Sequence, residues 1–162
     1  MTDNPSKPVP GATSPGELTA RVTQIRRQLE AATTGPGLAV TAHEIFCLVL
    51  ALCRAHENPA DPRFASFVMA AAHAANGRDA IGFTPGFPPG RLTSHQGELT
   101  AGEDGTRGTS WPEQIGDLCR QLAASLTRAG STCGGREKLA YVEAARCARN
   151  VSDLLSGCER AG

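Results

Sequence analysis

The stretch T-A-H-E-I-F-C-L-V-L-A-L-C-R-A-H-E, from Thr41 to Glu57, is apolar on more than one side when it is read as a helix. Its two apolar stripes at helical spacing consist of Ile45, Leu48, Val49 and Leu52, and of Phe46, Leu50 and Cys53. The other helical segments carry a single stripe each. A helix with two stripes needs neighbours on both sides, so we expect this segment to be the central helix of the fold.

Helix start and stop signals divide the rest of the chain. Capping boxes stand at Ser14 to Glu17, at Thr41 to Glu44 and at Ser110 to Glu113, and Asp61-Pro62 opens one more helix. The expected stops are near residues 35, 58, 77 and 130, where Gly or Pro follows the last periodic residue. A last helix is expected over approximately residues 136–156.

No segment shows the alternating pattern of a half-buried strand. The predicted fold is therefore all-α, a four- or five-helix bundle made of two helical hairpins, the second helix with the third and the fourth with the fifth, which the first helix completes. We expect residues 1–13 to form a disordered tail and residues 14–162 to form one domain. A long Gly/Pro-rich loop, residues 78–109, separates the third and fourth helices, and a loop of this length is usually a functional lid or disordered.

Composition excludes several classes of partner. The chain has 16 basic and 16 acidic residues, so it lacks the net charge that gathers nucleic acid or anionic lipid. The apolar run from Ile45 to Leu52 is far shorter than the roughly 20 residues that cross a bilayer. The N-terminal residues lack the apolar core of a secretion signal. We expect a cytoplasmic protein with no nucleic acid and no membrane partner, and its Arg, Ala, Gly and Pro bias suggests a GC-rich bacterial genome.

The 6 cysteines are expected as thiols in a reducing compartment. Five of them fall in helical patterns, where Cys behaves as a small hydrophobe. Cys133 differs because it lies in a turn just before a helix N-terminus and close to Arg136 and Lys138, where positive charge favours the thiolate. It is the candidate reactive thiol, although an incidental turn cysteine is the commoner case.

His43 and Cys47 are one helical turn apart and form a candidate pair of ligands for zinc or copper. Two ligands do not make a complete site, and a polar rim of the core is the alternative interpretation. The sequence contains no H-E-x-x-H motif, no phosphate-binding glycine loop and no G-x-S-x-G elbow. We therefore expect no cofactor, and we identify no group of residues that could act together in catalysis.

The Pro-rich segment from Gly82 to Gly90 carries Phe83 and Phe87, two aromatic side chains suited to docking in a groove. That groove belongs either to a partner or to the bundle itself, and docking on the bundle is the favoured alternative because exposed aromatics reduce solubility.

Two functions from different classes follow. The first is a small non-enzymatic bundle that acts through a protein partner or through self-association, as an accessory or regulatory protein. The second is a metal- or small-molecule-binding bundle, or an enzyme of that kind, in which loop 78–109 covers a pocket that includes His43, Cys47 and Trp111. The first is favoured because the sequence offers no catalytic constellation.

Overall fold

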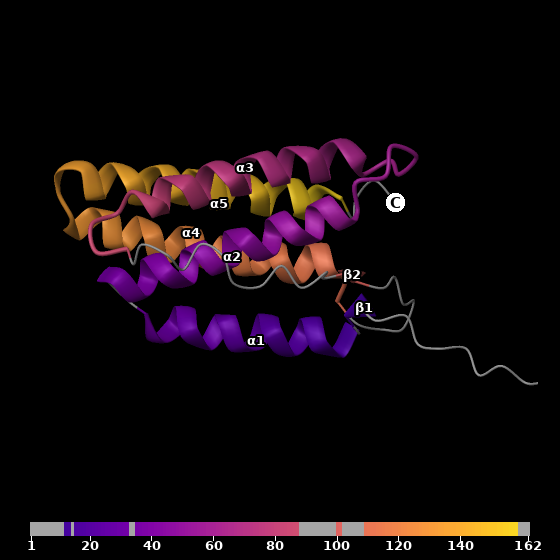
Figure 1. The fold of residues 1–162 in the computed structure, drawn as a ribbon, viewed down its shortest axis with the longest axis horizontal. Coiled ribbons are helices and arrows are strands. Elements are labelled where there is room, and N and C mark those ends of the chain that lie inside the picture. Colours follow the sequence, from indigo (N-terminus) through magenta and orange to yellow (C-terminus); the bar gives the residue numbers. More distant parts are fainter. Residues whose placement is uncertain (1–11, 14, 33–34, 88–99, 102–108, 159–162) are drawn as a thin grey trace, which may run out of the picture.

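The computed structural model describes residues 12–13, 15–32, 35–87, 100–101 and 109–158. Five helices account for most of this part of the chain: α1 (Pro15–Ala31), α2 (Gly35–Ala55), α3 (Phe64–Gly82), α4 (Trp111–Thr132) and α5 (Gly135–Gly157) (Figure 1). The all-α fold class is confirmed.

A minimal strand pair accompanies the helices. β1 (Ala12–Thr13) pairs in parallel with β2 (Thr100–Ala101), with Ala12 opposite Thr100 and Thr13 opposite Ala101. No strand was predicted at these residues. A ladder of two residues is too short to carry the alternating pattern by which strands are found in a sequence.

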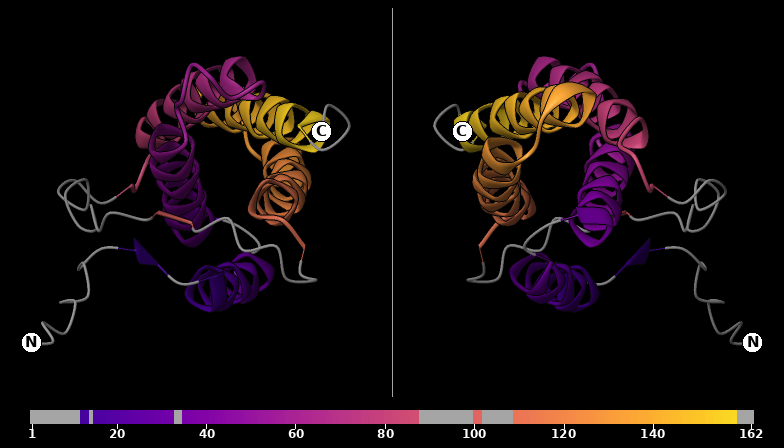
Figure 2. Two further views of the ribbon diagram at one scale, coloured as in Figure 1. Left: turned by 90° about the vertical axis from the view of Figure 1, so that its right-hand side faces the viewer. Right: turned by 90° about the vertical axis from the view of Figure 1, so that its left-hand side faces the viewer.

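Seen end-on, the helices form an arch with one open side (Figure 2). α2 packs against α3, α3 against α5, and α5 against α4, which confirms both predicted hairpins. α2 and α4 are the two ends of the arch and touch each other little. α1 lies across the gap between them and completes the bundle (Figures 1 and 2).

α2 begins at Gly35, before the predicted capping box at Thr41. Gly35 has a φ of 69° and Pro36 occupies the first turn, where proline is well tolerated. The hydroxyl of Thr41 donates instead to the carbonyl of Gly37 at 3.0 Å, within the helix. The prediction of an N-terminus at Thr41 was wrong because a threonine can satisfy its hydroxyl in a helix interior as well as at a cap.

Most residues of α2 are buried, including both predicted stripes. In the part of the chain that the structure describes, this 21-residue helix is also the one that is long and apolar enough to cross a membrane, a test that the core helix of a soluble protein passes equally. The additional turn and a half at its N-terminus makes it longer than the sequence indicated. The expectation of no membrane partner therefore stays a prediction, and so does the cytoplasmic location.

α3 begins at Phe64, preceded by Asp61, whose carboxylate accepts from the backbone N–H of Arg63 at 2.7 Å. The helix continues through Gly77 to Gly82, so residues 78–82 belong to it and not to the loop. A Cβ on Gly77 would lie 2.4 Å from Cζ of Phe46 in α2. The predicted stop at Gly77 was wrong because this glycine admits an aromatic ring and does not end a helix.

α4 starts as predicted. The side chain of Ser110 caps it by accepting from the backbone N–H of Glu113 at 3.4 Å. It does not stop at Gly130, which is buried in the helix with Tyr141 of α5 against it, a Cβ there lying 3.3 Å from the Cβ of Tyr141. The turn to α5 is therefore shorter than the predicted 130–135.

Candidate functional site

α1 closes the arch with a single row of apolar side chains. Leu18, Val22, Ile25 and Leu29 are each between 1% and 3% exposed. Their spacing of four, three and four residues places them on one face of the helix. The opposite face carries exposed charges such as Arg27 and Glu30. α1 is thus an amphipathic helix that packs on α2 and α4, and the surface of these two helices that its apolar row covers is called the groove below.

One hydrogen bond between described side chains joins α1 to α4. The hydroxyl of Thr19 donates to the side-chain oxygen of Gln114 in α4 at 3.3 Å, in an exposed position. None of the ion pairs between described residues involves α1. α1 also packs less extensively on α2 and α4 than the neighbouring helices of the arch pack on each other, that is, α2 on α3, α3 on α5 and α4 on α5. Among the described residues, burial of one row of apolar side chains is therefore the main contact that holds α1.

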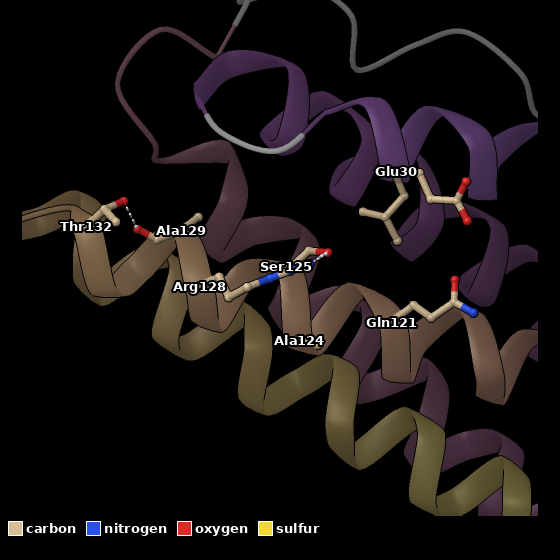
Figure 3. A pocket seen from close by; sticks show the side chains of 8 residues that line it. Glu30, Gln121, Ala124, Ser125, Arg128, Ala129 and Thr132 are labelled. Atoms are coloured by element: carbon tan, nitrogen blue, oxygen red, sulfur yellow. Dashed lines mark hydrogen bonds between the residues drawn. The ribbon is translucent and has the colours of Figure 1, made fainter.

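A cleft remains beside α1 because it is too short for the groove. α1 and α4 run in the same direction (Figure 1), and the contact between Thr19 and Gln114 sets their register. In that register α1 ends well before α4 does. The uncovered space is a cavity of about 440 Å³ (Figure 3). It is lined by Leu29 and Glu30 of α1 and by Gln121, Ala124, Ser125, Arg128, Ala129 and Thr132 of α4.

The surface of the cleft is mainly apolar, with polar groups at its edges. The guanidinium of Arg128 donates to the hydroxyl of Ser125 at 3.4 Å, and the hydroxyl of Thr132 donates to the carbonyl of Ala129 at 2.9 Å (Figure 3). Neither Arg128 nor Glu30 belongs to an ion pair with a described residue. The cavity volume falls in the range of ligand pockets, roughly 300–1,000 Å³. It has room for several side chains of a peptide or for a small apolar molecule.

The predicted metal ligands lie on α2, outside the residues that line the cleft. Nδ1 of His43 and Sγ of Cys47 are 3.7 Å apart. His43 was expected at the rim of the core, but it is only 9% exposed, and the ring of Phe87 lies over it with 5.1 Å between the ring centroids. Burial lowers the pKa of His43, and the nearby Arg78 lowers it further. Burial raises the pKa of Cys47. At neutral pH both groups are therefore uncharged.

The structure does not assemble the larger pocket that the second hypothesis requires. Trp111 stacks on His56 at the far end of α2, with 4.8 Å between ring centroids. His56 follows His43 by 13 residues, or about 20 Å along a helix. In the described ranges no group of three or more His, Cys, Asp or Glu side chains is placed to hold a metal ion. A four-ligand zinc centre is thus not formed there.

None of the six cysteines forms a disulfide bond. Burial raises the pKa of Cys53 to about 12 and that of Cys147 to about 11, and it raises the pKa of Cys119 as well. Cys133 follows the last residue of α4, is half-buried, and packs against the core. The prediction that it is a reactive thiol stays a prediction.

The two phenylalanines of the Pro-rich segment differ. Phe87 is half-buried against the core and covers His43, as expected for docking on the bundle. Phe83 is 84% exposed, so the expectation that it also touches the bundle was wrong. The hydroxyl of Thr84, between them in sequence, donates to the carbonyl of Ile81 at 2.7 Å and ends α3. Partner binding by Phe83 and Phe87 stays a prediction.

The groove and the cleft were not found from the sequence, although the single apolar row of α1 was. No protein-family model matches this chain, and comparison with curated proteins and with solved structures gave no significant similarity.

Proposed function

We propose that this chain is a non-enzymatic interaction protein that binds an amphipathic helix of a partner in the groove between α2 and α4. In the free chain that groove is occupied by α1. The observation that carries the proposal is the way α1 lies there, as one amphipathic helix on an arch whose other four helices pack closely on one another. Helix-in-groove binding is a common mode of peptide recognition.

The row on α1 defines what a partner helix would need. Four apolar anchors at positions equivalent to Leu18, Val22, Ile25 and Leu29 would fill the same places. Each anchor contributes about 1.5–3 kcal/mol on full burial, which is an upper range because free helices must also be ordered. A second copy of α1 satisfies these requirements, so self-association by exchange of α1 uses the same groove.

The cleft favours a partner helix longer than α1. The stripe from Gln121 to Thr132 extends about 16 Å along α4. A partner helix that continued along this stripe would bury apolar surface that α1 leaves open. Such a helix would compete with α1 despite the advantage that α1 has from being part of the same chain.

The test uses the full chain with Ile25→Asp and a labelled peptide of residues 15–31. Ile25 is 1% exposed, so the carboxylate should detach α1 and open the groove while the arch stays folded. We expect the peptide to bind the variant, measured by fluorescence anisotropy. It should bind the parent chain at least about tenfold more weakly, because tethered α1 competes at an effective concentration on the order of millimolar.

Two controls isolate the groove. A peptide that itself carries Ile25→Asp should not bind, and a chain with Arg27→Asp, on the exposed face of α1, should behave like the parent. The proposal fails if the parent and the Ile25→Asp chain bind the peptide equally or not at all. It also fails if circular dichroism shows that Ile25→Asp unfolds the whole chain, since α1 would then be an integral part of the core.

A further inference from the structure

His43 and Cys47 occupy the same side of α2, one turn apart, and Phe87 covers the imidazole. Cys47 is half-buried, whereas His43 is buried. The guanidinium of Arg78, on α3, is engaged by the carboxylate of Asp79 at 3.1 and 3.0 Å. Arg78, Asp79 and Glu44 are the charged groups close enough to act on the pair.

The imidazole nitrogens of His43 make no strong hydrogen bond with the described part of the protein. Its Nε2 is buried and has no hydrogen-bond partner among the described residues, and its Nδ1 has only the thiol of Cys47 at 3.7 Å. Buried polar groups are normally hydrogen-bonded, and leaving one unpaired costs about 1–3 kcal/mol. A ligand on Nδ1 would replace this weak contact with a strong bond, and Nε2 would then carry the ring proton.

We propose that His43 and Cys47 form a two-ligand site for a Cu(I) ion. Thiolate and imidazole are the ligands that suit this soft, monovalent ion, which does not need the four ligands of a structural zinc site. This inference does not depend on the proposed function, because the pair lies outside the residues that line the cleft.

The charge of the ion is the reason that this site should prefer Cu(I) to a divalent ion. On binding, the S–H bond of Cys47 breaks, a Cu–S bond forms, the proton passes to solvent, and no electron is transferred. One positive charge thus replaces another, and the neutral pair gives a neutral complex. A divalent ion would add a further positive charge in a partly buried site beside Arg78, with the carboxylates of Glu44 and Asp79 as the nearby negative groups.

The distance between the ligand atoms is compatible with a shared ion. With bonds of about 2.0 Å to nitrogen and about 2.3 Å to sulfur, as in zinc sites, the two atoms are about 3.5 Å apart at a tetrahedral angle and about 4.3 Å apart when collinear. The observed 3.7 Å lies between these limits. A two-coordinate Cu(I) ion favours a nearly collinear arrangement, so on binding the two side chains would turn and move these atoms apart by about 0.6 Å.

The experiment measures Cu(I) binding to the full chain without oxygen, in competition with a chromophoric Cu(I) chelator. The parent should take up one Cu(I) tightly. Cys47→Ser should abolish this uptake, and His43→Gln should weaken it at least about tenfold, as even the loss of an outer-shell partner commonly does.

Cys133→Ser is the matched control, since it removes the other half-buried thiol and should leave affinity unchanged. Circular dichroism establishes that each variant is folded, and Cys47→Ser, which keeps a similar shape, carries the test if His43→Gln does not fold. Equal uptake by Cys47→Ser and the parent would overturn the site, because other thiols would then hold the ion. No uptake by the parent, or a greater loss in Cys133→Ser than in Cys47→Ser, would overturn it too.

Discussion

Leu48→Asp is expected to leave the chain unfolded at room temperature. Leu48 is 2% exposed on α2, where a carboxylate would be desolvated and meet only apolar side chains. The loss should exceed about 4–5 kcal/mol, which is a large part of the 5–15 kcal/mol that stabilises a typical domain. Far-UV circular dichroism and urea denaturation measure the result.

The matched control is Leu139→Asp, the same substitution at a leucine of α5 that is 69% exposed. Its stability should stay within about 0.5 kcal/mol of the parent. If Leu48→Asp melted like Leu139→Asp, α2 could not be the core helix that the fold requires.

Gly77→Ala is expected to lower the free energy of unfolding by about 1–3 kcal/mol, although alanine is the better helix former. The added Cβ would fall 2.4 Å from Cζ of Phe46, so the ring or α3 must move. Urea denaturation of the parent and the variant gives this difference.

Two further variants test whether the contact with Phe46 is the cause of the destabilisation by Gly77→Ala. Gly82→Ala, where a Cβ meets nothing within 4 Å, should be neutral or stabilising by up to about 1 kcal/mol. In a Phe46→Leu background, Gly77→Ala should cost less, with a coupling of about 0.5–3 kcal/mol between the two sites. Equal costs in both backgrounds would mean that Phe46 is not what Gly77 accommodates.

The sequence predicted most of the architecture because apolar rows and caps are local signals. The helical hairpins follow from rows such as that of α4, and Ser110 caps α4 as its pattern indicates. The predicted helix ends were wrong where glycine has two possible roles, as a helix stop or as a place for a close contact. Gly77 and Gly130 look like helix stops in sequence, whereas their role depends on Phe46 and Tyr141, which reach them only through tertiary packing.

The candidate sites were predicted less well, for a related reason. His43 and Cys47 are close in sequence, so their pairing was visible, but the burial of His43 depends on Phe87, which comes from another segment. The groove and its cleft depend on the distance between α2 and α4 and on the length of α1 relative to α4. No local pattern encodes those distances.

The central claim is that α1 is a replaceable occupant of the groove and not a part of the cooperative core. Native-state hydrogen exchange of the parent chain, resolved by residue, tests it most directly. We predict that the amides around Val22 and Ile25 exchange at least about tenfold faster than those of buried residues in α2 and α5, through an opening that leaves the arch intact. Exchange of α1 with the same opening free energy as α2 and α5 would contradict the account.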